Sequence, residues 1–311
     1  MVLVAGESLI DMIPSSGPEG APDYRAVPGG SPYNVAIALG RAGLRPVFLC
    51  GFGSDRFGNL LLDRLKASDV DPTFCLPSQR LTTLGFVSNG ANGDPQYAFY
   101  TEGTAGCEVS KNDIPARVPD RIRALHFGSF SLAVEPFGGA LEELCCREAG
   151  ERLISIDPNI RPFLVSDRSA YEQRLSRMLN LADVIKVSDE DLAWLRPGTD
   201  PIDYARERLN LGAALVVVTR GGAGAVAVCG GGEVEVAGES VEVVDTVGAG
   251  DTFQANLLVA LSETGLLEKT AIRNLDTKTL GRAIRFAGRA AAINCGRQGC
   301  DPPRRDELGA W

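Results

Sequence analysis

The chain of 311 residues has a single histidine, and its eight cysteines include no Cys-x-x-Cys pair. Structural zinc usually takes four cysteine or histidine ligands, and a Cys–His catalytic pair could use only His126. The apolar segment 124–128 around His126 is typical of a buried strand, so we expect a structural histidine. The N-terminal segment 1–14 has no basic region and carries Glu7, so it is not expected to be a signal peptide. Without a secretory signal, a disulfide framework is not expected, and most of the cysteines are predicted to be small buried hydrophobic residues.

Positive charge is also in the minority, because 31 Lys and Arg stand against 40 Asp and Glu, a formal net charge of −9. General binders of nucleic acid or of anionic membranes need a basic face, so neither partner is expected. No apolar run approaches the roughly 18 residues that span a bilayer. We therefore expect a cytoplasmic globular protein. Its 36 glycines follow no fixed period, which excludes collagen, but their backbone N–H groups could still bind anions.

Short apolar runs alternate with helical patterns along the chain. The predicted strands are 2–5, 47–50, 124–127, 153–156, 184–187, 215–218 and 225–228. The predicted helices are about 33–42, 56–67, 136–149, 170–181, 201–211, 252–264 and 278–294. Continuously apolar strands separated by helices predict an α/β protein with a mainly parallel sheet covered on both faces. Two stretches, 9–28 and 82–101, break this alternation; the second predicts a hairpin around 89–95, and both could form a small inserted sheet.

Two common phosphate-binding motifs are missing. No lysine follows a glycine, which excludes a P-loop, and the Gly-x-Gly sequences at 51–53 and 248–250 lack the third glycine of the dinucleotide fingerprint. What remains is the segment 243–253, in which an apolar run, expected to be a strand, enters a glycine turn that opens a helix. Free N–H groups at a helix N-terminus form an anion site. On these residues alone, Asp251 either touches the group that attacks a phosphate or only caps the helix.

The segment 245–253, Asp-Thr-Val-Gly-Ala-Gly-Asp-Thr-Phe, closely resembles the C-terminal signature of the PfkB, or ribokinase-like, sugar kinase family. The segment 28–43 resembles the N-terminal signature of the same family, and Gly-Phe-Gly-Ser-Asp-Arg-Phe-Gly at 51–58 follows at the usual distance. The resemblance covers nearly the whole chain. It implies a single ribokinase-like domain, 1–311, with a three-layer α/β/α fold and a β-sheet lid formed by segments 9–28 and 82–101.

The resemblance assigns the reaction to one carboxylate and one turn. It implies that Asp251 is the general base for a sugar hydroxyl that attacks the γ-phosphate of ATP, and that the N–H groups of Gly248, Ala249 and Gly250 form an anion hole. A carboxylate at a helix N-terminus stays ionised at neutral pH and is a weak base. Most of the rate is therefore expected from positioning and charge neutralisation.

Substrate contacts follow from the same resemblance. The expected sugar-binding residues are Asp11, Gly29, Gly30, Asn34, Phe99 and Arg161. Without the resemblance, we would interpret Asn34 as a helix cap and Gly29 and Gly30 as a simple turn. Phe99 would then be a packing residue of the lid. The expected ATP-binding residues are Ser188, Thr219, Gly221, Gly224 and Asn294.

Two metal sites are implied as well. The segment 188–191 stands where the family has Asn-x-x-Glu, so Asp191 or Glu190 would hold Mg²⁺ through water, with Asp189 as a further choice. An acidic helix N-terminus is the alternative explanation of this run. Asp245 and Val247, together with the loop 294–303, resemble a site for a monovalent cation such as K⁺.

We expect the sugar to be fructose, because the segments 157–162 and 186–190 resemble those of the fructokinase-like members of the family. A 2-keto-3-deoxygluconate kinase is the alternative; its acid substrate would need a cation, whereas the expected lid strand 97–102 offers none and ends in Glu102. A nucleoside kinase and a catalytically silent sugar- or nucleotide-binding protein remain open. A homodimer through the lid is compatible with the family.

Overall fold

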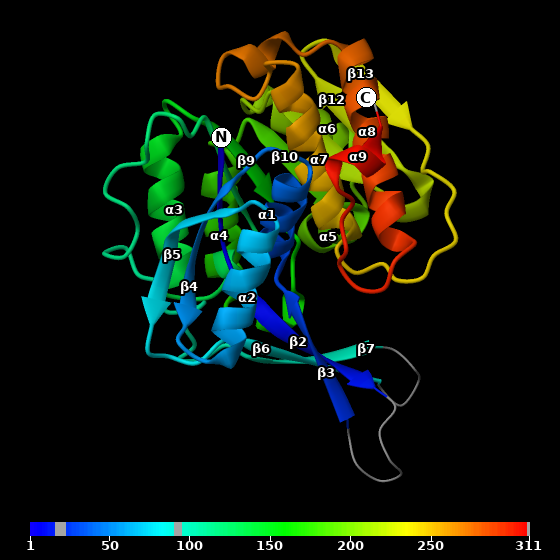
Figure 1. The fold of residues 1–311 in the computed structure, drawn as a ribbon. Helices are drawn as coiled ribbons and strands as arrows, with labels where there is room; N and C mark the ends of the chain where they lie inside the picture. Colours follow the sequence, from blue (N-terminus) through cyan, green and yellow to red (C-terminus); the bar gives the residue numbers. More distant parts are fainter. Residues whose placement is uncertain (16–22, 90–94, 310–311) are drawn as a thin grey trace.

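The computed structural model describes residues 1–15, 23–89 and 95–309. Among these residues, nine strands form one sheet in the order β13-β12-β11-β10-β9-β8-β1-β4-β5 (Figure 1). The strands are β1 (Val2–Ala5), β4 (Val47–Gly53), β5 (Asp71–Ser78), β8 (Ala124–Gly128), β9 (Leu153–Asp157), β10 (Val184–Ser188), β11 (Leu215–Thr219), β12 (Ala225–Cys229) and β13 (Gly232–Val236). Neighbours from β5 to β11 run parallel, and the two pairs made by β12 are antiparallel, which confirms the mainly parallel sheet.

Helices cover this sheet. They are α1 (Ser31–Arg41), α2 (Arg56–Ala67), α3 (Phe137–Glu148), α4 (Arg168–Leu179), α5 (Asp189–Leu195), α6 (Pro201–Asn210), α7 (Ala249–Glu263), α8 (Thr277–Cys295) and α9 (Arg305–Leu308). Short 3₁₀ turns lie at Phe130–Leu132, Pro162–Leu164, Gly221–Ala223 and Ala271–Asn274. Contacts link α2 to α1, α1 to α7 and α7 to α8, so these four helices form one continuous layer. Every residue of β1, β8 and β9 is buried, so the other face of the sheet is covered too.

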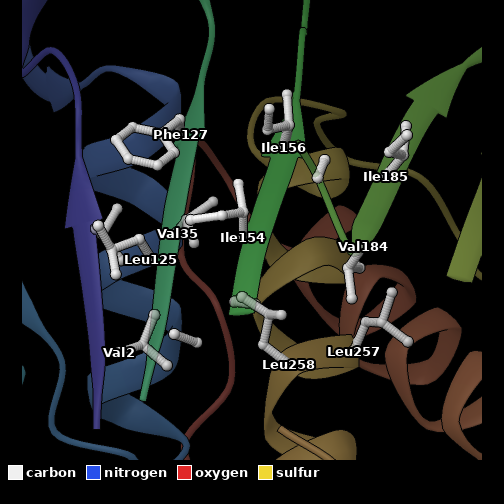
Figure 2. Close-up of a cluster of buried hydrophobic side chains, with 14 of the residues drawn as sticks. Val2, Val35, Leu125, Phe127, Ile154, Ile156, Val184, Ile185, Leu257 and Leu258 are labelled. Atoms are coloured by element: carbon white, nitrogen blue, oxygen red, sulfur yellow. The ribbon is translucent and has the colours of Figure 1, made fainter. Parts of the chain in front are cut away.

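The core lies between the sheet and the α1–α7 layer. Figure 2 shows Val35 of α1 and Leu257 of α7 pointing towards strand residues such as Ile154. All three side chains are fully buried, and each such burial contributes about 1.5–3 kcal/mol. This packing fixes the starts of α1 and α7 next to each other at one end of the strands.

A second sheet of four strands, in the order β3-β2-β6-β7, projects from the large sheet (Figure 1). It consists of β2 (Leu9–Ser15), β3 (Asp23–Gly29), β6 (Leu84–Asn89) and β7 (Pro95–Tyr100). The two segments predicted to interrupt the fold therefore meet, through a parallel pair between β2 and β6. The predicted hairpin between β6 and β7 is confirmed by their antiparallel pairing, while 16–22 and the turn residues 90–94 lie outside the described residues.

The strand predicted directly before the glycine turn is wrong. Residues 243–247 form an exposed loop, in which Val243 and Val244 are 59% and 61% exposed. The backbone N–H groups of Val244 (2.8 Å) and Asp245 (3.1 Å) donate to the Cys295 carbonyl oxygen. The valines are apolar by sequence, but among the described residues they belong to no strand of either sheet. The strands β5 and β13 were not predicted, because β13 alternates in polarity and β5 has polar residues and prolines on both sides of a short apolar run, unlike the central strands.

The surroundings of the histidine and of most cysteines agree with a structural role. His126 is 1% exposed, its Nδ1 lies 3.1 Å from Ser155 Oγ, and burial lowers its pKa to about 3. It is a buried structural residue, as predicted. All eight cysteines are free thiols, and five of them are buried. Within the described residues, no helix has the length and apolar character needed to cross a membrane.

Candidate active site

The predicted site residues gather at the carboxyl edge of the large sheet. Asp157 ends β9, Ser188 ends β10 and Thr219 ends β11, and these parallel strands end side by side. Ligands of open α/β sheets bind outside this edge, where strand order reverses. Here the reversal falls at β1, which has β4 on one side and β8 on the other.

The glycine turn before α7 is tightly constrained. Gly248 has φ +74°, a left-handed conformation that strains other residues. A Cβ atom on Gly248 would also lie 2.3 Å from the Sγ atom of Cys300, which is 5% exposed. The first N–H groups of α7 have no partners within the helix and carry its positive dipole end. The turn thus has the geometry of an anion site, with Cys300 packed beneath it.

Asp251, in the first turn of α7, is held by side chains from two other segments. Ser31 Oγ donates to Asp251 Oδ1 at 2.6 Å, and Asn34 Nδ2 donates to Oδ2 at 2.8 Å. Asn159 Nδ2, from the loop after β9, lies 3.4 Å from Oδ1. Burial raises the pKa of Asp251, and these donors from Ser31 and Asn34 oppose the rise. The carboxylate is therefore a stronger base than its place at a helix N-terminus suggests.

A buried ion pair lies below the turn and was not found from the sequence. Lys186 Nζ donates to Asp157 Oδ2 at 2.8 Å, and both side chains are 3% exposed or less. Burial raises the pKa of Asp157 to about 6 against the attraction of Lys186. Burial also disfavours the charged lysine, but Asp157, Asp191 and Asp251 outweigh it and raise the pKa of Lys186. The sequence contained a signal for this pair, which is a lysine in an otherwise apolar predicted strand. A buried lysine almost always has a partner of opposite charge.

This ammonium group stands close to the glycine turn. Lys186 Nζ lies 3.2 Å from where a Cβ atom on Gly250 would be. A fixed positive charge therefore reinforces the dipole of α7 at the place where the chain exposes its N–H groups.

Asp11 of β2 supplies a second carboxylate, from the small sheet. Its Oδ2 lies 2.2 Å from the place of a Cβ atom on Gly29, and its Oδ1 lies 3.0 Å from that of Gly85. Glycine is needed on both neighbouring strands because any side chain would displace the carboxylate. Burial raises the pKa of Asp11 to about 6, and the nearby charge of Arg161 opposes this rise. Among the described residues, Asp11 has no side-chain hydrogen bond, so its oxygens are available to a ligand.

Glu7 joins the large sheet to the start of α1. The side chain is 1% exposed and accepts the N–H groups of Ser31 (3.3 Å) and Ser131 (3.2 Å). A Cβ atom on Gly30 would lie 2.8 Å from the backbone oxygen of Glu7, so this glycine permits the close approach. Glu7 thereby fixes the end of α1 that carries Ser31 and Asn34. Glu7 was not predicted to be part of the site.

Arg161 and Phe99 connect the two sheets. Arg161 Nη1 donates to the side-chain oxygen of Asn159 at 2.7 Å, and its charge acts on both Asp11 and Asp251. The Phe99 ring of β7 lies 5.8 Å from Phe130 and is stacked on Phe163 at 5.6 Å. Phe99 therefore holds the small sheet against loops at the edge of the large sheet. Its contact with a sugar stays a prediction.

Ser188 is the N-cap of α5 and stands beside Thr219 in the register of β10 and β11. Its Oγ accepts the Asp191 N–H at 3.0 Å, while Asp191 Oδ2 accepts the Ser188 N–H at 3.0 Å. Asp191 Oδ1 also accepts the N–H of Ile160 at 2.7 Å. Asp191 is thus buried with both oxygens engaged, and Glu190 is exposed beside it.

Because both of its oxygens are engaged, Asp191 fits Mg²⁺ only through water molecules bound to the ion. A carboxylate whose oxygens already accept N–H groups keeps lone pairs for metal-bound water, and Mg²⁺ commonly retains several waters. Asp191 can orient such waters, and the exposed Glu190 can bind the ion or its waters.

The expected nucleotide turn follows β11. Gly221–Ala223 form a 3₁₀ turn, and Gly224 has φ +94°. A Cβ atom on Gly224 would lie 2.0 Å from the carbonyl oxygen of Val236, so this glycine is required by the chain itself. Thr219 Oγ1 lies 3.4 Å from the Val187 carbonyl oxygen, on the neighbouring strand. The turn stands at the same sheet edge as Ser188, as a shared ATP site requires.

Two loops that were expected to bind a monovalent cation are fastened together. Asp245 accepts the N–H groups of Val247 (3.0 Å) and Gly299 (2.9 Å). Asn294 donates to the Val247 carbonyl oxygen at 2.8 Å and accepts the Asp301 N–H at 2.9 Å. The carboxylate and carbonyl oxygens of these loops are donors that suit K⁺. Asn294 is fully buried and its side chain positions the two loops, and its contact with ATP stays a prediction.

Comparison with known proteins agrees with this geometry. Residues 1–307 match the model of the pfkB family carbohydrate kinases. A fructokinase of Rhizobium leguminosarum bv. trifolii is 44% identical over 280 residues, covering 90% of this chain and 85% of that protein. The structure of a Xylella fastidiosa fructokinase with bound ATP superposes with a TM-score of 0.90 at 26% identity, covering 99% of this chain and 96% of that one.

A Vibrio cholerae fructokinase double mutant, solved with fructose, ADP and potassium, has a TM-score of 0.84 at 26% identity, with 99% of this chain and 96% of that chain covered. The chain belongs to the pfkB family of carbohydrate kinases. Its activity is that of an ATP-dependent sugar kinase on a ribokinase-like fold.

Proposed function

We propose that this enzyme transfers the γ-phosphate of ATP to a hydroxyl group of fructose. The name of the Rhizobium relative and the fructose in the Vibrio structure support this choice of sugar. The observation that carries the proposal is the placement of Asp251, which is buried at the N-terminus of α7 and held by Ser31 and Asn34. A base in this position acts where a phosphoryl group would rest on the helix N-terminus.

In the proposed reaction, Asp251 accepts the proton of the attacking sugar hydroxyl. The sugar oxygen forms a bond to the γ-phosphorus, the bond to the β,γ-bridging oxygen breaks, and ADP leaves with that electron pair. The N–H groups of Gly248, Ala249 and Gly250 would hold the transferring phosphoryl group, with the ammonium group of Lys186 behind them. The N–H groups and the lysine would oppose the negative charge on this group.

The nucleotide would occupy the edge between Ser188 and the turn 219–224. Mg²⁺, held through water by Asp191 and Glu190, would shield the phosphate charges of ATP. The Asp245–Val247 loop, fastened to Asn294 and Gly299, would bind a monovalent cation next to the anion hole. The potassium ion of the Vibrio structure supports this cation site.

The sugar would lie between Asp251 and the small sheet. Asp11 can accept two hydroxyl hydrogen bonds, and Asn34 would contribute its amide next to Gly29 and Gly30. The small sheet would then act as a lid, which excludes water that would otherwise hydrolyse ATP.

One observation favours the second candidate, an acid sugar such as 2-keto-3-deoxygluconate. Arg161 lies close enough to Asp11 and Asp251 to influence the pKa of both. It provides a cation near the sugar, which the sequence of the lid strand did not offer. However, Arg161 Nη1 already donates to two backbone oxygens and to the side chain of Asn159, which favours a positioning role.

A panel of sugars in a coupled ADP-release assay tests the assignment. We expect the highest kcat/KM for fructose, with 2-keto-3-deoxygluconate, ribose and a nucleoside much lower. Arg161→Gln is the informative variant: a loss limited to the acid sugar would mean that Arg161 recognises a carboxylate. A preference for 2-keto-3-deoxygluconate in the unmodified enzyme would contradict the fructose proposal.

A further inference from the structure

A pocket of about 400 Å³ lies between the small sheet, helices α1 and α2 and the C-terminal loop. Four arginines line it: Arg25 of β3, Arg41 of α1, Arg64 of α2 and Arg304 before α9. Asp301 is the single acidic residue among the lining residues. In a chain with a formal net charge of −9, this is a local concentration of positive charge.

Most of that positive charge is not neutralised by the protein. Arg41 pairs with Asp301 at 2.5 Å. Within the described residues, Arg25, Arg64 and Arg304 have no carboxylate partner; Arg25 donates to Gln298 at 3.3 Å and Arg64 to the Cys300 carbonyl oxygen at 2.6 Å. Like charges that share one pocket repel each other, and a bound anion removes that cost. Guanidinium groups are the side chains best suited to phosphate, because they donate in pairs from a planar fork.

We infer that this pocket binds a small phosphate-bearing anion, at a site separate from the ATP site. A volume of about 400 Å³ holds a phosphorylated metabolite of modest size, since ligand pockets commonly span roughly 300–1,000 Å³. Ser188 and the turn 219–224 are not among the lining residues, so the nucleotide does not account for the pocket.

The pocket is connected to the catalytic turn by one residue. Cys300 lies with its carbonyl oxygen bonded to Arg64 and with its Sγ beneath Gly248. Arg25 extends from the small sheet to Gln298 in the same loop. A bound anion would therefore contact the lid, α1, α2 and the loop under the anion hole at once.

Calorimetric titration with pyrophosphate and with glycerol phosphate tests this inference. The titrations are done in magnesium-free buffer on enzyme saturated with a non-hydrolysable ATP analogue, so that the nucleotide site is filled. We expect one bound anion per chain. The stronger of the two probes tells whether the site prefers free or esterified phosphate.

Three variants locate the binding. Arg304→Gln removes a charge that has no carboxylate partner in the described residues, and should weaken binding about tenfold. Asp301→Asn removes the only lining acid and should strengthen it. Arg117→Gln, far from the pocket along the chain and 81% exposed, is the matched control and should bind as the unmodified enzyme does.

The inference is overturned if the ATP analogue abolishes all binding, because the anion would then occupy the nucleotide site. Equal affinity in Arg304→Gln and Arg117→Gln would overturn it as well. Circular dichroism of each variant confirms that a weaker titration does not come from unfolding.

Discussion

Asp251 lies in the first turn of α7 and Asp11 lies on the small sheet, and their surroundings differ. Asp251, at the edge of the large sheet, accepts bonds from Ser31 and Asn34 before any substrate is present. Asp11, on the small sheet, has two glycine neighbours and no side-chain hydrogen bond among the described residues. The group assigned to chemistry is preorganised, whereas the group assigned to sugar recognition keeps its bonding capacity for the ligand.

The same contrast extends to the charges. Around Asp251, a buried lysine and its partner Asp157 complete a network that belongs to the folded protein. Around Asp11, the opposing charge is that of Arg161, which comes from the loop after β9 of the large sheet. The large sheet therefore fixes the reaction geometry, and the small sheet adds to it a sugar-binding surface that depends on how the two sheets meet.

The largest expected effect comes from Asp251→Asn, which keeps the shape but removes the base. We expect kcat to fall by about 10²–10⁴, while ATP and fructose still bind within a few-fold. Calorimetry gives the two affinities, and a coupled assay gives kcat. The exposed Asp306→Asn is the control and should leave kcat unchanged. Unchanged turnover in Asp251→Asn would remove Asp251 from the role of base.

Lys186→Met tests whether the large-sheet network is built into the fold. It leaves Asp157 buried without its partner, and loss of one member of a buried pair costs about 3–5 kcal/mol. Urea denaturation should show this loss in the free energy of unfolding. The double variant Lys186→Met with Asp157→Leu should recover much of the stability, because the buried carboxylate that lost its partner is removed as well.

The double variant also separates stability from catalysis. Since Lys186 stands behind the glycine turn, the double variant should fold yet keep a lowered kcat. Recovery of both properties would mean that the pair is only structural. A stable single variant would contradict the network that the ion pair implies.

The smallest expected effect is a pH dependence of sugar binding. The pKa of Asp11 is raised to about 6, so the carboxylate is ionised above that pH and protonated below it. An ionised carboxylate accepts two hydroxyl hydrogen bonds and a protonated one accepts fewer. The affinity for fructose should therefore fall up to tenfold per pH unit as the pH drops below about 6.

Asp11→Asn is the matched control for this titration. At pH 8 it should bind fructose about tenfold more weakly, since a hydrogen bond to a charged group is lost, and its affinity should not follow the pH profile of Asp11. Asp157 titrates in the same range, so an identical profile in both proteins would assign the pH dependence to Asp157.

Much of the fold could be predicted, because local patterns are enough for it. Continuous apolar runs gave the central strands, and the helix 56–67 coincides with α2. Segments with mixed polarity were missed, as at β5 and β13, since an edge strand is half exposed. The apolar run 243–244 was misjudged because burial depends on neighbours that are distant in the sequence.

The sequence by itself determined the family, through two glycine-rich signatures, and with it Asp251 and the turn before α7. Only the tertiary structure decided what surrounds them. Lys186 became part of the site because β10 places it under Gly250, and Cys300 because the C-terminal loop folds beneath Gly248. A sequence signature is readable because certain backbone conformations require particular residues, such as glycine. A charge network depends on side chains from distant strands, whose distances the chain sets only when it packs.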